Sequence, residues 1–158
     1  MTESDTLVAL VQQIENALAI AMASQVSKLG LVLDKAEIEL RVAVKKSAVI
    51  GGKFELGVLL EASAGMDETR GHAITLSLIP KTNISLGDRD AEDLAEAIAA
   101  VAQAMSSISR AAAPNFNPSE ATALIEVELN KEGKLQVITG AGGAGMRSHK
   151  IKLTFRPS

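Results

Sequence analysis

An internal repeat constrains this chain more than any other feature of its sequence. The segment from His72 to Pro80 recurs from His149 to Pro157, with His, three alternate apolar residues and Pro at identical spacing. Four further segments of the first half have counterparts, in the same order, in the second half: Leu7–Leu18 with Leu94–Met105, Ile38–Val44 with Ala123–Leu129, Gly52–Leu56 with Gly133–Val137, and Gly65-Met66 with Gly145-Met146. Chance does not readily produce five matches in one order, so the sequence predicts a tandem duplication.

Each repeat has the pattern of a helix followed by strands. Apolar residues recur at three- and four-residue intervals from Leu7 to Ala21, which is typical of an amphipathic helix. Alternation of apolar and polar residues then predicts strands over Leu29–Leu33, Ile38–Val44, Phe54–Leu60 and His72–Pro80. We expect a turn at Asp34-Lys35 and an antiparallel meander with one buried face, which the preceding helix covers.

The second repeat follows the same plan with one departure. Its helix is predicted from about Asp90 to Ser107, and its strands lie near Thr122–Asn130, Lys134–Thr139 and Ser148–Arg156. Residues 109–119 contain two prolines and do not alternate, so we expect the first strand of this repeat to be lost or remodelled.

The predicted fold class is therefore α+β. The chain would consist of a first helix-plus-sheet repeat over residues 1–81 and a second over 82–158, each with a meander of three or four strands, fused into one body. A unit of about 75 residues buries little surface alone, so the two repeats should cover each other as a pseudo-twofold pair, like an isologous dimer. They could join helix against helix or sheet edge against sheet edge, and the broad apolar stripes favour the first. The sequence leaves the oligomeric state open between a monomer with this internal pairing and a dimer of such chains.

Composition excludes several classes of function. Sixteen basic and nineteen acidic side chains give a net charge of −3, and aromatic residues make up 2%. Both values argue against a nucleic-acid or membrane surface. The chain has no cysteine, so it has no disulfide and no thiolate metal site. The first residues are acidic, and the apolar stretch from Leu7 to Ala23 is interrupted by Glu15 and three amides, so we expect a cytoplasmic protein.

The order of these elements resembles the trypsin-co-occurring domain family, second type. The resemblance is carried by Leu29-x-Leu31-x-Leu33, Ile38-Glu-Leu40-Arg-Val42-Ala-Val44 and His72-Ala-Ile74-Thr-Leu76-Ser-Leu78-Ile-Pro80. It is best from Leu7 to Lys81, continues in the second repeat through the helix and last strand, and fails between Ser109 and Ser119. These small bacterial modules occur beside trypsin-like peptidases in immunity and conflict systems. The resemblance implies an adaptor or sensor role with a protein partner, and it transfers no catalytic residue.

The two histidines of the chain, His72 and His149, occupy equivalent places in the two repeats. Imidazole binds metals and titrates near neutral pH, so the pair could form a metal or proton-transfer site. Two ligands do not complete such a site, and no cysteine or matched carboxylate accompanies them. We interpret both as residues whose ring nitrogen fixes a turn by bonding a backbone carbonyl, and we retain them as candidate interaction residues.

Two further motifs have weaker functional readings. The run from Gly140 to Gly145 resembles a phosphate-binding loop, but a strand follows it and no Gly-Lys-Ser/Thr is present, so a hairpin connection or mobile contact loop is favoured. Gly-x-Ser-x-Gly is absent, and neither histidine has a serine and an aspartate suitably placed in the sequence. We therefore expect no catalytic residues, no metal site and no cofactor.

The polar face of the predicted sheets carries charges of both signs, on Glu37, Glu39, Arg41, Lys53, Glu55, Glu61, Glu126, Glu128, Lys134, Lys150 and Lys152. Solvation and cross-strand pairing explain such a face. The alternative is a polar docking platform whose sheet edges recruit a partner strand.

The function predicted from the sequence is a non-enzymatic protein-interaction module. Its expected partner is a protein, such as a co-encoded peptidase or effector, and not nucleic acid or a membrane. The competing class is a small-ligand-binding protein that uses a groove between the two repeats near the Gly-rich loops. A third class is an enzyme that uses His72 and His149. It predicts that a variant with both histidines changed to Ala loses activity but still folds.

Overall fold

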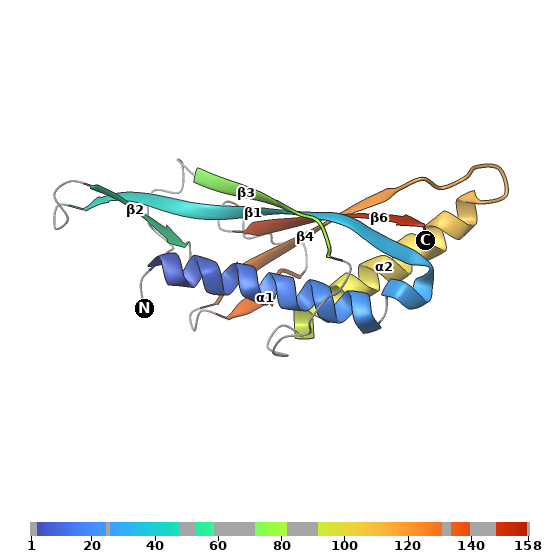
Figure 1. Cartoon of the computed structure of the whole chain (residues 1–158), viewed down its shortest axis with the longest axis horizontal. Helices are drawn as coiled ribbons and strands as arrows, with labels where there is room; N and C mark the ends of the chain where they lie inside the picture. Colours follow the sequence, from blue (N-terminus) through green and yellow to red (C-terminus); the bar gives the residue numbers. More distant parts are fainter. Residues whose placement is uncertain are drawn as a thin grey trace.

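The α+β class is confirmed by the computed structural model, which describes residues 3–24, 26–47, 53–58, 72–81, 92–130, 134–139 and 148–157. Within these ranges the elements are α1 (Glu3–Ser24), a 3₁₀ helix η1 (Val26–Leu29), β1 (Leu31–Ser47), β2 (Lys53–Val58), β3 (His72–Leu78), α2 (Glu92–Ala112), β4 (Ala121–Leu129), β5 (Leu135–Val137) and β6 (His149–Pro157). Figure 1 shows the two helices together on one side of a long, twisted sheet. The described strands belong to one antiparallel sheet.

The longest strand, β1, contains a bulge where the sequence predicted a turn. The strand runs without a break through Asp34 and Lys35, and its register against β6 shifts between Leu33 and Lys35. The buried residues change phase at this point, from Leu31 and Leu33 to Ala36 and the even-numbered positions after it. One extra residue in a bulge restores the apolar side chains to the helix side of the sheet. The predicted turn was therefore wrong.

The strand order differs from the predicted meander, in which β2 would lie between β1 and β3. Instead, β2 pairs with β1 over Val42–Ser47, and β3 pairs with β1 over Ala36–Val42. In the second half, β5 and β6 both pair with β4. The first strand of each half is thus its central strand, because it is long enough to hold one partner on either edge.

The strand registers of the two halves agree. Val42 lies opposite His72, and Val127 lies opposite His149. The agreement continues through the pairs Leu40–Ile74 and Ile125–Ile151, Ile38–Leu76 and Ala123–Leu153, Ala36–Leu78 and Ala121–Phe155. Residues 113–120, by contrast, form a turn and an irregular segment between α2 and β4, so no strand occupies 109–119.

The halves join in both of the ways considered. Helices α1 and α2 contact each other, and β6 pairs with β1 over Leu31–Glu39. This strand junction is head to tail, because the last strand of the second half joins the first strand of the first half. An isologous junction would also pair β3 with β4, and the described strands contain no such pair. The expected pseudo-twofold packing is therefore not shown.

The core lies between the helices and the inner face of the sheet. Its completely or almost completely buried members include Leu10, Ile14, Ala17, Leu94, Ile98, Ala102, Ile38, Val127, Leu129, Ile151, Leu153 and Phe155. Burial of each large aliphatic or aromatic side chain contributes about 1.5–3 kcal/mol. Neither described helix combines the length and apolar content that a bilayer span requires.

Candidate functional site

His149 is a core residue that replaces a backbone acceptor at the end of a strand ladder. Its side chain is fully buried, and its Nδ1 accepts a hydrogen bond from the Arg41 backbone N–H at 2.9 Å. Pairing between β6 and β1 ends at Glu39, and pairing between β2 and β1 begins at Val42. The ring therefore satisfies a β1 amide in the interval between two partner strands. The bond differs from the predicted one, in which a ring nitrogen donated to a carbonyl at a turn.

The same burial makes His149 a neutral group at physiological pH. Desolvation, assisted by the positive charge of Arg41, lowers the pKa of His149 from 6.5 to about 4. Because Nδ1 accepts a hydrogen bond, the proton of the neutral ring resides on Nε2. Nε2 is buried without a hydrogen-bond partner among the described residues, and so is Nε of Arg41. This arrangement stabilises the fold only when the ring is uncharged.

The structure does not bring the two histidines into one site. His72 is exposed at the start of β3, opposite Val42, whereas His149 is buried and bonded to Arg41. Because β3 and β6 lie on opposite edges of β1, the strand itself separates the two rings. In the described part of the chain, no three His, Cys, Asp or Glu side chains gather closely enough to hold a metal ion.

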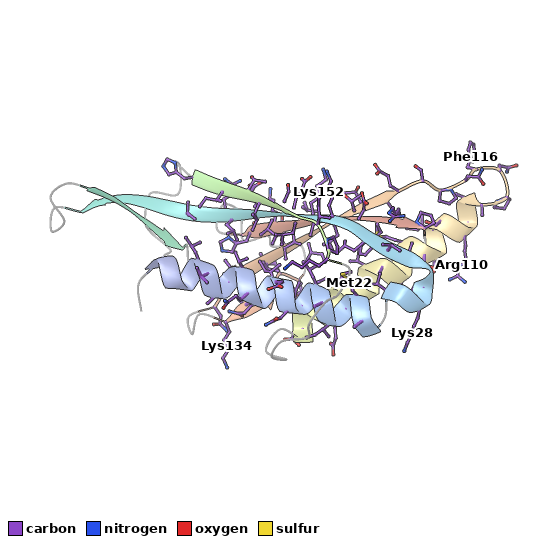
Figure 2. The ribbon with its side chains drawn as sticks, viewed as in Figure 1. Met22, Lys28, Arg110, Phe116, Lys134 and Lys152 are labelled. Carbon is purple, nitrogen blue, oxygen red and sulfur yellow. The ribbon has the colours of Figure 1, made fainter. Side chains whose placement is uncertain are left out.

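The outer face of the sheet carries alternating charges across neighbouring strands. Lys152 lies opposite Glu37 and rises from the face away from the helices, as Figure 2 shows. Lys35 Nζ contacts a Glu37 oxygen at 3.0 Å, and this ion pair raises the pKa of Lys35 and lowers that of Glu37. A second pair joins Arg41 and Glu39 at 3.1 Å. Both of these ion pairs lie within β1, and a cross-strand ion pair of this face joins Arg156 of β6 to Asp34 of β1 at 3.4 Å. The side chains of Lys53, Glu55 and Glu61 lie outside the described part.

A groove lies between α1 and the end of β3. Its volume is about 420 Å³, and its walls are mostly apolar. The contributing residues are Val11, Glu15, Leu18, Ala19 and Met22 from α1, Leu33 and Ala36 from β1, and Leu78–Lys81 from β3 and the residues after it. Ile79 at its rim is 80% exposed. The alternation of this strand predicts only that it contributes to a buried face, and it gives no sign of the groove.

A second, more open cavity of about 360 Å³ lies between the two halves. Lys28–Leu31 line it from the first half, and the second half contributes Ser106, Ser109, Arg110, Ala113, Pro118 and Pro157. Figure 2 shows Lys28 and Arg110 on this side of the molecule. The Gly140–Gly145 run, near which a ligand groove was expected, lies outside the described residues.

Large apolar side chains are exposed on two strands of the sheet and in the segment before β4. Ile74 and Leu76 on β3 are 39% and 36% exposed, and Leu124 on β4 is 57% exposed. Phe116, in the segment before β4, projects from the far end of the molecule in Figure 2 and is 75% exposed. Alternation in the sequence placed Ile74 and Leu76 on one face of β3, but it could not show that β3 lies at an edge of the sheet.

Comparison with known proteins identifies one family. Residues 6–80 match the family model described as trypsin-co-occurring domain 2. This range includes α1 from Thr6 onward, β1, β2 and β3, and the resemblance stated from the sequence is confirmed over it. No curated protein and no solved structure matches the chain significantly.

Proposed function

Because residues 6–80 carry a match to trypsin-co-occurring domain 2, we propose that this chain is a non-catalytic protein-interaction module that acts as an adaptor or sensor. Its partner would be a trypsin-like peptidase or an effector encoded beside it in a bacterial conflict system. The family description supports the link to a peptidase. The proposal of a binding role without catalysis is supported by an apolar groove on the surface of the module.

The observation that carries this proposal is the groove between α1 and β3, whose lining residues all lie within the matched range except Lys81, which directly follows it. Its walls combine apolar side chains such as Val11, Leu18 and Met22 with two charged residues, Glu15 and Lys81. Grooves of this kind accept an apolar segment of a partner, while the few polar groups fix its orientation. We therefore propose that an extended or helical segment of the peptidase or effector inserts apolar side chains here.

A substitution at the rim of the groove tests this role. Ile79→Asp should weaken binding of the co-encoded peptidase at least about tenfold, because docking would force a carboxylate out of water. The matched control is Ile108→Asp on α2, a residue that is 69% exposed and does not line the groove. Isothermal titration of the purified proteins measures both affinities. No binding by the unmodified chain, or equal weakening by both variants, would contradict the proposal.

We also propose that the two halves arose by duplication of one module. The equal strand registers support this origin, since Val42 pairs with His72 as Val127 pairs with His149. In this view the second half has become a structural extension of the first. It supplies β6, which pairs with β1, while the groove remains on the first half.

The alternative, a small-ligand-binding protein, has its site in the cavity between the halves. Lys28 and Arg110 there would favour an anionic compound. Native mass spectrometry of the purified protein distinguishes the two functions, because a retained ligand adds mass to the 16.5 kDa chain. Loss of that added mass in Arg110→Ala would favour the alternative.

A further inference from the structure

Two strands of the described sheet each have one edge that no described strand pairs with. β3 pairs with β1 on one side only. β4 pairs with β6 on one side, and on the other side β5 covers it from Val127 onward, while the Ile138 N–H donates a hydrogen bond to the Glu126 carbonyl. The stretches without a described partner strand are therefore the outer edge of β3 and residues 121–125 of β4.

These two stretches lack the features that usually protect a sheet edge. Native edges are blunted by Lys, Pro or inward-pointing charges. No Lys, Arg, Asp or Glu occurs from His72 to Leu78, and none occurs from Ala121 to Ile125. Ile74, Leu76 and Leu124 are at least 36% exposed on these strands. Both stretches thus combine backbone groups that no described strand pairs with and apolar side chains that are partly exposed.

The junction inside the molecule shows how two such edges fit together. β6 corresponds to β3 and β1 to β4, as their equal registers show. In the internal junction, β6 occupies the edge of β1 next to β2, over Lys35–Glu39 and the residues before the bulge. The corresponding edge of β4, next to β5, is the open one.

We propose that a second copy of this chain binds head to tail, with the open edge of β3 in one molecule paired to the open edge of β4 in the next. This inference goes beyond the proposed adaptor function, because it concerns two sheet edges and not the groove. Head-to-tail contacts repeat, so the assembly extends beyond a dimer as concentration rises.

The internal register specifies which residues meet. Leu76 lies opposite Ala121 of the next molecule, as Leu153 lies opposite Ala36 within one molecule. In both pairs a leucine lies opposite an alanine on the inner face of the sheet.

On the outer face of the proposed junction, Thr75 of one molecule lies opposite Thr122 of the next. Their internal counterparts are Lys152 and Glu37, which form an oppositely charged cross-strand pair. The junction has about five paired residues per strand, so it is smaller than the internal one. Interfaces of this size belong to the weak, transient class, and the association should depend strongly on concentration.

Sedimentation equilibrium of the full chain tests the assembly without any partner. The weight-average mass should rise above 16.5 kDa between micromolar and millimolar concentration. Thr75→Lys combined with Thr122→Lys should keep the mass at that of a monomer, because like charges then face each other across the junction. Thr75→Lys combined with Thr122→Glu should restore or strengthen association, because it copies the charges of the Lys152–Glu37 pair. Circular dichroism checks that all variants remain folded.

Cysteine cross-linking tests the register, since the chain has no cysteine of its own. A mixture of Thr75→Cys and Thr122→Cys molecules should give a disulfide-linked dimer on mild oxidation, whereas either variant alone should give several-fold less. Ser77→Cys replaces Thr75→Cys as the off-register control and should also give several-fold less dimer with Thr122→Cys.

Three results would overturn the inference. They are a constant monomer mass up to millimolar concentration, efficient cross-linking of Thr75→Cys with itself, and equal cross-linking by the Ser77→Cys control. The second result would indicate an isologous β3–β3 contact. None of these results bears on peptidase binding in the groove, so the two proposals fail separately.

Discussion

Phe155→Ala should lower the free energy of unfolding by about 3–5 kcal/mol, the range typical of a truncated core aromatic residue. Phe155 is 1% exposed and lies opposite both Leu33 of β1 and Ala121 of β4. It therefore fills the core at the point where the two halves share a strand. A cavity here removes contacts of both halves together, and a cooperative loss of structure should follow. Urea denaturation followed by circular dichroism gives the difference directly.

The matched control for this prediction is Phe116→Ala. Phe116 is 75% exposed, so its truncation should change the free energy of unfolding by less than about 0.5 kcal/mol. Phe155→Leu supplies a milder variant if Phe155→Ala does not fold. A loss below about 1 kcal/mol for Phe155→Ala would show that β6 is not packed at the centre of the core.

Acidification should destabilise the protein through His149. Its pKa is lowered from 6.5 to about 4 on folding, so the unfolded chain binds a proton more readily than the folded one. The stabilisation from the neutral ring is fully present above pH 6.5 and is lost as the pH falls from there toward 4. A shift of this size corresponds to about 3 kcal/mol. Urea midpoints measured across this pH range report the loss.

Two glutamine variants isolate this contribution from that of the carboxylates. His149→Gln keeps an acceptor for the Arg41 amide but cannot titrate, so its stability should vary much less with pH between 6.5 and 4. His72→Gln should retain the full pH dependence, because His72 is exposed. Equal pH dependence in both variants would contradict the assignment. The same variants bear on the enzymatic alternative. If His149 is structural, its substitution lowers the stability of the fold, whereas a catalytic residue could be replaced without loss of folding.

The elements of the fold could be predicted from the sequence where one local pattern determined them. Apolar spacing located both helices, and alternation located β3, β4 and β6. The bulge in β1 was also present in the pattern, because the apolar positions change phase between Leu33 and Ala36. A turn and a bulge both resolve such a change, and only the pairing of β1 with β6 distinguishes them.

Strand order could not be predicted in the same way. Alternation shows that Ile74 and Leu76 share a face, but it does not show which strand lies beside them. The meander assumption placed β3 beside β2, whereas β3 pairs with β1 and lies at an edge. For this reason a strand predicted as half-buried has side chains that are more than a third exposed. Partner choice depends on long-range contacts, which a single sequence does not specify.

In the candidate site, too, the sequence indicated which residues to consider but not the surroundings that the strand order gives them. The sequence singled out His72 and His149 by their equivalent positions, and the structure gives them different environments. Burial of a histidine is decided by the strands around it, and β6 is an inner strand whereas β3 is an outer one. The groove at α1 was missed because its wall combines Met22 with Ile79, residues that lie far apart in the sequence.

The pairing of β6 with β1 has a consequence for proteins that carry only one such module. The segment that matches the family ends at residue 80, yet half of β1 is completed by a strand that begins at His149. A protein that consisted of residues 6–80 alone would lack β6 as the partner of β1 over Leu31–Glu39, so that edge would be available to another strand. In this chain the strand belongs to the same polypeptide.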